Sequence, residues 1–342
     1  MSDHYWLGIT IIILGGIANG CFALPMKFSR SWQWENTWLI FSLLALLVLP
    51  WALLAGFVPH VSNLYRSAPW RLVLYPLVFG GLWGIAQVTF GLSIKAIGIA
   101  IAFAVVQGLQ TPIGSLVPLL VFDPSALFRP RGLLLLASFP ILFLGLILYA
   151  VAGRRRETEQ VASKGLSEMP KGSFVAGLAT AAFTGVFGAN LNLGFAFGGR
   201  LIQRSLQLGA NPATATYCVW ALVLTAGSIP NFLYCAYLLS RNETWNLFRA
   251  VGWLKESMLS TAMGVLWLGG ILLYGIGASL MGTYGTSVGF VLMVASVVIA
   301  ANVAGVLSGE WTSVSSRTRR LLAAGLASIL LSVVVLSFGH LV

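Results

Sequence analysis

The sequence has few charged residues and no long polar segment. Asp, Glu, Lys and Arg make up 8% of its 342 residues, whereas hydrophobic residues make up 58% and the mean hydropathy is +0.89. Soluble domains are about 25% charged and about 45–50% apolar. The longest polar stretches span only about 20 residues, fewer than the ~50 residues of a small domain. The composition therefore excludes a soluble domain.

Motifs for disulfide, metal and catalytic chemistry are also missing from the sequence. Cys21, Cys218 and Cys235 lie in apolar stretches without CxxC spacing, so they predict packing residues and no disulfide framework. The histidines are isolated, and there is no HExxH motif, no paired-carboxylate motif and no glycine-rich phosphate loop. We therefore expect no enzyme, no cofactor and no bound metal.

Ten apolar stretches fill the chain almost from end to end. About 20 apolar residues cross the ~30 Å hydrocarbon core of a bilayer as a helix, which satisfies its own backbone hydrogen bonds there. The predicted fold class is an all-α polytopic membrane protein with ten transmembrane helices. The expected spans are residues 6–25, 37–57, 72–93, 98–122, 132–152, 173–197, 214–239, 259–280, 285–307 and 320–341.

The basic residues predict the orientation of these spans. The net charge is +11, but Lys and Arg lie between the spans, where they favour lipid headgroups as partners rather than nucleic acid. Fourteen of the 20 basic residues fall on one side if the loops alternate. Cytoplasmic loops carry the excess of Lys and Arg, so both termini are expected on the periplasmic side. No basic residue precedes the first apolar run, which predicts a retained span rather than a signal peptide.

The two halves of the chain carry a weak internal repeat. Trp83 aligns with Trp267 at an offset of 184 residues, and Asn19 aligns with Asn192 at an offset of 173. Five spans in each half give the halves opposite orientations, and such inverted repeats are typical of secondary transporters.

The repeat predicts the domain organisation. The first five-helix repeat is expected over residues 1–152 and the second over 173–342. The polar segment 153–172, which contains three consecutive arginines, is expected to be a linker.

Three groups of residues in the chain match the pattern of a known transporter family. They are Cys21-Phe22, Pro25, Lys27, Trp32, Trp34-Glu35, Trp38 and Leu49-Pro50-Trp51; Gly81-Leu82-Trp83-Gly84-Ile85 with Gly91-Leu92 and Lys95; and Glu310-Trp311. In these residues the chain resembles the L-rhamnose–proton symporter family of the drug/metabolite transporter superfamily. The resemblance implies ten spans and proton-coupled uptake of a deoxyhexose across the bacterial inner membrane.

The residues leave the substrate and the coupling ion open. The stretch Gly282–Ser296 has no acidic residue and no histidine, whereas the family resemblance leads us to expect more titratable groups near the ninth span. A carrier of another sugar, an amino acid or a drug is the main alternative, and a non-transporting membrane sensor or scaffold is the other. We expect a monomer or a weak dimer.

A neutral sugar requires amide or hydroxyl groups for hydrogen bonds and an aromatic face for its C–H surface. Polar groups within spans are costly in lipid, so they must face the protein interior or a wet cavity. Interhelical hydrogen bonding and core packing are the structural alternatives. The candidate substrate-binding residues are Asn19, Trp83, Gln87, Gln107, Gln110, Asn190, Asn192 and Trp267.

Glu35 is the candidate proton-coupling residue. It flanks the second span, and a proton-coupled carrier needs a titratable group at a position with alternating access. The alternative is a structural carboxylate that favours the helix dipole and pairs with Lys27.

Overall fold

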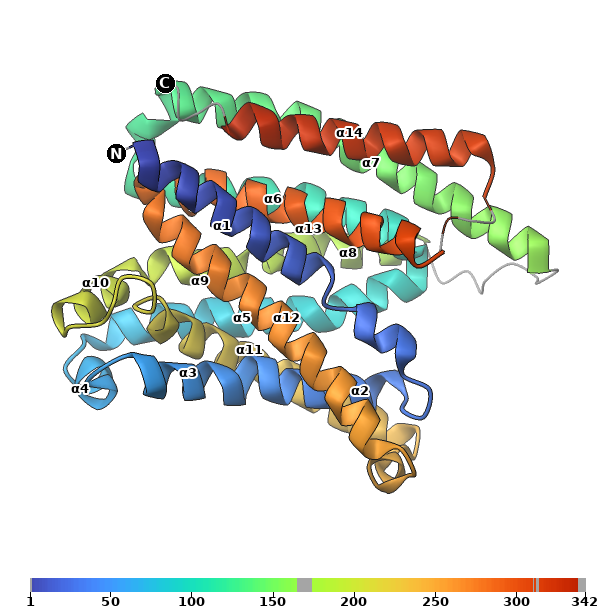
Figure 1. Ribbon diagram of the computed structural model, residues 1–342, viewed down its shortest axis with the longest axis horizontal. Coiled ribbons are helices and arrows are strands. Elements are labelled where there is room, and N and C mark those ends of the chain that lie inside the picture. Colours follow the sequence, from blue (N-terminus) through green and yellow to red (C-terminus); the bar gives the residue numbers. More distant parts are fainter. Residues whose placement is uncertain (1, 165–173, 310, 312–313, 338–342) are drawn as a thin grey trace.

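The chain folds into a bundle of helices, shown by a computed structural model in Figure 1. The structure describes residues 2–164, 174–309, 311 and 314–337, and every regular element among them is a helix. Within these described residues, ten helical spans are long and apolar enough to cross a membrane. This confirms the predicted all-α polytopic membrane fold. The start of α1 and the end of α14 lie at one end of the bundle, which we call the terminal end (Figure 1).

Five spans precede the polar segment and five follow it. The first five are α1 (Ser2–Gly20) with η1 (Leu24–Phe28); α2 (Trp34–Ser42), η2 (Leu43–Val48) and α3 (Leu49–Phe57); α5 (Trp70–Ile97); α6 (Ile99–Phe122); and α7 (Pro130–Lys164). The second five are α8 (Phe174–Gly188), α9 (Asn190–Phe197) and α10 (Gly199–Gln207); α11 (Tyr217–Arg241); α12 (Trp253–Leu280); α13 (Val288–Leu307); and α14 (Ser316–Ser337). The connections hold α4 (Val61–Arg66), η3 (Pro124–Phe128), η4 (Trp245–Arg249) and η5 (Gly282–Tyr284).

The fifth span is longer than the sequence predicts. Helix α7 continues through the three arginines to Lys164, so the first part of the expected linker 153–172 is helical. Its remainder, from residue 165 onward, lies outside the described residues, as do residues 338–341 of the expected tenth span.

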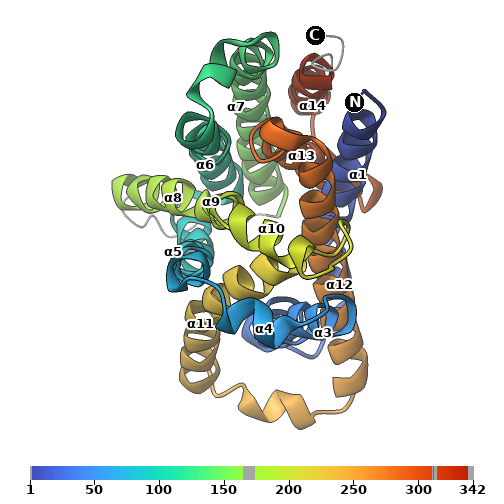
Figure 2. The ribbon, with the colours of Figure 1, turned by 90° about the vertical axis from the view of Figure 1, so that its left-hand side faces the viewer.

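The sixth span is broken into three helices. A Cβ atom on Gly188, at the end of α8, would lie 2.5 Å from Oε1 of Gln110, so α8 comes close to the Gln110 side chain of α6 where α8 ends. The chain restarts as α9 at Asn190 and again as α10 at Gly199. Helix α10 crosses the terminal end of the bundle (Figure 2). The first break places Asn190 and Asn192 near the middle of the span.

Helices of the two halves pack against each other in matching pairs. Helix α1 packs on α12 and α13, and its counterpart α8 packs on α5 and α6. Helix α5 packs on α11, as its counterpart α12 packs on α2, while α7 lies along α14. Glycines allow the closest approach: Gly15 of α1 and Gly270 of α12 face each other, and a Cβ on either would lie less than 3 Å from the carbonyl oxygen of the other. Such small-residue contacts are typical of helices that associate in lipid.

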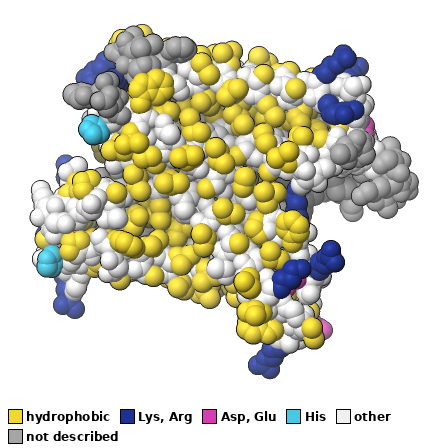
Figure 3. Space-filling model, in the orientation of Figure 1, with side chains coloured by type: hydrophobic (Ala, Val, Ile, Leu, Met, Phe, Trp, Pro, Cys, Tyr) yellow, Lys and Arg dark blue, Asp and Glu magenta, His cyan; other side chains and the backbone are white. Residues whose placement is uncertain are grey.

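The surface has apolar side chains along the spans and basic side chains at the two ends, as a protein in a bilayer requires. Hydrophobic side chains cover most of the face visible in Figure 3, and Lys and Arg gather toward the two ends of the bundle. Large hydrophobic side chains are exposed along many of the spans. In water this surface would be unfavourable, whereas hydrocarbon solvates it.

Candidate functional site

Trp83 and Trp267, which the repeat aligns, stack on each other in the centre of the bundle. Their ring centroids are 5.7 Å apart and their planes are inclined by 22°. Each is the 14th or 15th residue of a 28-residue helix, so the stack lies near the midplane. Phe41 of α2 packs edge-on against Trp267 at 6.0 Å. The midplane contact between repeats is where secondary transporters hold substrate.

We expect the two indole rings to be energetically coupled. In a double-mutant cycle of Trp83→Leu and Trp267→Leu, which removes each aromatic ring, the coupling free energy should be about 0.5–1.5 kcal/mol, typical of aromatic pairs. Trp70→Leu is the matched control, because Trp70 lies on the same helix as Trp83 and is 66% exposed. Unfolding of the reconstituted protein in a graded denaturing detergent measures the effect. Additive single effects at positions 83 and 267 would contradict the stack.

The three asparagine candidates are buried and hydrogen-bonded to backbone carbonyls. Asn19 Nδ2 donates to the carbonyl of Trp267 at 3.1 Å, so it joins α1 to α12. Asn192 Nδ2 donates to the carbonyls of Gly114 and Thr286, both at 2.7 Å, and its Oδ1 accepts from the hydroxyl of Tyr274. Asn190 Nδ2 donates to Phe187, within its own span, at 2.7 Å. These bonds hold helices together, and a role for these amides in substrate binding stays a prediction.

The glutamine candidates lie on α5 and α6. Gln87 is half-buried, one turn after Trp83, and Gln110 contacts Gly188 where the sixth span breaks. Gln107 differs from them because its Oε1 is buried and has no hydrogen-bond partner. A buried acceptor without a partner costs about 1–3 kcal/mol, which a donor on a bound ligand can offset.

Thr111 extends the polar face of α6 beyond the residues that sequence reasoning selected. It is fully buried and lies four residues after Gln107, so the two side chains share a helix face. Its hydroxyl also has no hydrogen-bond partner. The i, i+4 spacing of Gln107 and Thr111 in an apolar span was the available signal. Gln107 and Thr111 together form the unsatisfied polar face of α6.

A cavity of about 390 Å³ opens at the terminal end of the bundle. Phe122 and Asp123 line it from the end of α6, and Thr283 and Thr286 line it from the connection between α12 and α13. Its volume lies in the ~300–1,000 Å³ range of small-molecule sites. The carboxylate, the two hydroxyls and the aromatic ring are groups that can contact a polyhydroxy solute.

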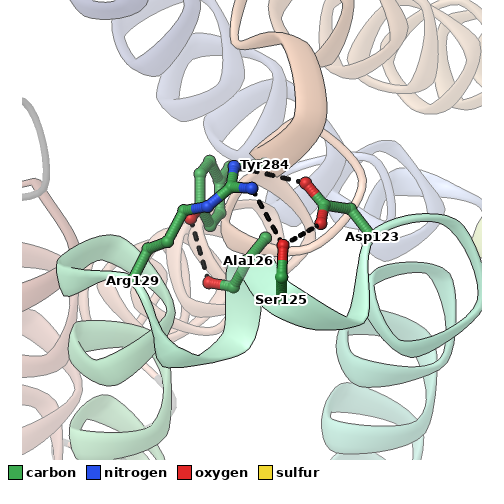
Figure 4. A network of polar contacts seen from close by, with 5 residues as sticks. All are labelled: Asp123, Ser125, Ala126, Arg129 and Tyr284. Carbon is green, nitrogen blue, oxygen red and sulfur yellow. Dashed lines mark hydrogen bonds and ion pairs between the residues drawn. The ribbon is translucent and has the colours of Figure 1, made fainter.

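A polar network beside this cavity joins the two halves of the chain (Figure 4). The Asp123 carboxylate accepts a hydrogen bond from Ser125 Oγ at 2.6 Å and pairs with the Arg129 guanidinium at 3.3 Å. Arg129 also donates to Ser125 Oγ at 2.9 Å. The hydroxyl of Tyr284, from the second half, donates to the carbonyl of Ala126 at 3.0 Å. The Ser125 hydrogen bond, with help from Arg129, lowers the pKa of Asp123 below its usual value, so this carboxylate is charged at neutral pH.

Glu35, the predicted proton-coupling residue, is buried at the opposite end of the bundle. It lies in the first turn of α2 and is 5% exposed. Its Oε1 accepts hydrogen bonds from Asn242 Nδ2 and Thr244 Oγ1, both at 2.9 Å. Both donors belong to the turn after α11, so Glu35 links the first half of the chain to the second.

Glu256 is a second buried carboxylate, which the sequence analysis did not select. It lies in the first turn of α12, is 2% exposed, and accepts hydrogen bonds at 3.0 Å from the backbone N–H groups of Arg30 and Ser31. Glu256 is thus a carboxylate of the second half with donors in the first half, whereas Glu35 is a carboxylate of the first half with donors in the second. Glu310, part of the family-like pattern, lies outside the described residues.

Comparison of the sequence with known proteins identifies a matching family. A family model described as L-rhamnose-proton symport protein (RhaT) matches residues 1–341. Relatives named L-rhamnose-proton symporter are 24% identical in Pectobacterium atrosepticum, 22% in Escherichia coli and 24% in Mannheimia succiniciproducens. Each alignment covers 99% of this chain and 99% of the relative. The similarity therefore extends over all ten spans.

Proposed function

This chain belongs to the L-rhamnose-proton symport protein family, and we propose that it is a secondary active transporter that takes up L-rhamnose together with protons. The family match over residues 1–341 carries this proposal. We also propose that the protein moves its substrate without a chemical reaction and without a cofactor, with the proton as coupling ion. Drug/metabolite superfamily membership is part of the proposal.

The proposed architecture is an inverted repeat in the bacterial inner membrane. The matching helix pairs support it. Helix α1 of the first half packs on α12 and α13 of the second half, and its counterpart α8 packs in the same way on α5 and α6 of the first half. The bias of basic residues toward the end opposite the termini supports a periplasmic terminal end. The transporter is proposed to act as a monomer or weak dimer.

The proposed mechanism is alternating access between two ends that differ in structure. The 390 Å³ cavity lies at the terminal end, while Glu35 and Glu256 tie the halves together at the opposite end. This pairing fits a form that receives sugar from the periplasm. For release on the other side, rocking of one half against the other must break these carboxylate hydrogen bonds and close the cavity.

The sugar is proposed to pass from the cavity to the midplane. Asp123, Thr283 and Thr286 are proposed to meet it first, and Gln107 and Thr111 to supply unpaired hydrogen-bonding groups deeper in the bundle. Separation of the Trp83 and Trp267 rings would expose two aromatic faces to its C–H surface. Asn19, Gln87, Gln110, Asn190 and Asn192 remain proposed contacts of this site.

Asp123→Asn is expected to raise the KM for uptake without shifting its pH profile. The substitution preserves the shape but removes a charged acceptor for a sugar hydroxyl, so the KM should rise severalfold while solvent screening limits the effect. Because the pKa of Asp123 is lowered, its charge is present at neutral pH and is lost only as pH falls through that lowered pKa. Initial rates measured between about pH 5.5 and pH 8 test this. A shifted pH profile with an unchanged KM would contradict it.

Uptake of labelled L-rhamnose into proteoliposomes tests the proposed function. With an inward proton gradient, the sugar should accumulate above its external concentration, and an ionophore that collapses the gradient should abolish accumulation. Equilibration that ignores the gradient would refute proton coupling but keep a rhamnose carrier. If no rhamnose enters, the substrate is wrong, and a panel of sugars, amino acids and drugs distinguishes another carrier from a non-transporting protein.

A further inference from the structure

A long apolar groove opens on the surface of the bundle between α1, α13 and α14. Its volume is about 650 Å³. Hydrophobic side chains from all three helices line it, and the other lining residues are Lys27 and two serines. Ala300 and Ala304 of α13 form a floor of small side chains, with Ile17 of α1 and Leu330 of α14 at its sides. The surface of Figure 3 is hydrophobic over this part of the molecule. The groove therefore suits an apolar occupant that comes from the membrane.

The length of the groove matches one leaflet of a bilayer. Its lining residues on α13 recur at helical spacing from Ser296 to Leu307, and Ser308 ends the stripe. Twelve residues of helix rise about 18 Å, slightly more than half of the ~30 Å hydrocarbon core. The groove thus extends from one membrane surface, at the end opposite the termini, to about the midplane. A single lipid acyl chain fits this geometry.

Basic residues mark the end of the groove at the membrane surface. Lys27 lines the groove, and its Nζ donates a hydrogen bond to Ser308 Oγ. Arg319 is exposed and lies eleven residues before Leu330 on α14. Eleven residues are close to three helical turns, so Arg319 is on the helix face that meets the groove. Positive charge at this level of the membrane complements a lipid phosphate.

We propose that this groove is a binding site for an anionic phospholipid. One acyl chain lies along α13, and the phosphate group lies between Lys27 and Arg319. The bound lipid contacts α1 of the first half and both α13 and α14 of the second half. It therefore supports packing between the halves, independently of which solute the protein transports.

Native mass spectrometry of the full chain tests the headgroup contact. The protein is reconstituted in vesicles of equal phosphatidylglycerol and phosphatidylethanolamine, extracted in mild detergent and analysed for retained lipid. Phosphatidylglycerol should be retained preferentially, and Lys27→Gln or Arg319→Gln should each weaken its retention about fivefold, from ~1 kcal/mol per basic residue. Lys255→Gln and Arg317→Gln are matched controls: Lys255 does not line the groove, and Arg317 lies on the opposite face of α14 from Leu330.

Filling the groove tests the acyl-chain contact separately. Ala304→Phe should lower retention of phosphatidylglycerol at unchanged helical content, because the ring occupies the floor of the groove. Cys21, which lines the groove and is half-buried, supplies a second measurement: bound lipid should slow its alkylation in wild type but not in Ala304→Phe. Equal retention of the two lipids by the wild type would overturn the proposal. Full retention by Lys27→Gln, Arg319→Gln and Ala304→Phe would do so as well.

Discussion

Gly84→Leu is expected to destabilise the bundle more than any other change considered for this protein. Gly84 of α5 is buried, and a Cβ atom there would lie 2.4 Å from the carbonyl oxygen and 2.7 Å from the Cα of Gly227 on α11. Backbone atoms cannot rotate aside, so the two helices must separate. We expect a loss at or above the upper end of the ~1–3 kcal/mol typical of overpacking. Thermal loss of monodisperse protein on size-exclusion chromatography measures it.

Gly81→Leu is the matched control for this prediction. Gly81 lies three residues earlier on the same helix, and no atom lies within 4 Å of a Cβ built on it. Both changes gain up to about 1 kcal/mol of helix propensity. Only the variant at position 84 should therefore unfold at a lower temperature. If the two variants melt alike, close contact between α5 and α11 does not limit stability.

Glu35→Gln is expected to abolish proton-driven accumulation of sugar while leaving equilibration intact. The glutamine Oε1 can still accept the hydrogen bonds that Asn242 and Thr244 donate, so the substitution keeps this link between the halves while it removes the titratable proton. A gradient of about 2 pH units permits up to about 100-fold accumulation for one proton per sugar, at ~1.4 kcal/mol per pH unit. In the variant the accumulation ratio should approach about 1 under the same gradient.

Glu243→Gln is the control for the coupling prediction. Glu243 lies between Asn242 and Thr244 in the sequence but is exposed, so its removal changes the charge of the same turn without touching the buried carboxylate. Its accumulation ratio should equal that of the wild type. Gradient-driven accumulation by Glu35→Gln would assign proton coupling to another group. Glu256, buried at the same end and linking the halves through the backbone N–H groups of Arg30 and Ser31, is then the next candidate.

The spans were predictable from the sequence, whereas several of their ends were not. Crossing hydrocarbon requires about 20 apolar residues in a self-satisfied helix, so composition alone decided that the chain has ten spans. The extension of α7 to Lys164 and the break of the sixth span depend on neighbours. Gly188 ends α8 where Gln110 approaches it, and this contact joins residues 78 positions apart in the sequence.

Some features of the candidate site were also predictable from the sequence, whereas others depend on the fold. The repeat singled out Trp83 and Trp267 as equivalent positions, but only the packing of α5 and α12 in the folded bundle brings their rings together. Asn192 was predictable as a buried amide, whereas its partners on α6, on α12 and before α13 were not. Nothing in the local sequence distinguishes Asp123 or Glu256 from ordinary residues at helix ends.

The membrane environment, the number of spans and the family could be predicted from the sequence, because hydrophobic length and local motifs are properties of continuous segments. Which polar side chains have hydrogen-bond partners depends on the packing of the folded bundle. This packing placed the unpaired oxygen of Gln107 in the bundle, the cavity at Asp123 and the crossed hydrogen bonds of Glu35 and Glu256. A buried polar group must find partners wherever packing brings them, and those partners lie on helices far apart in the chain.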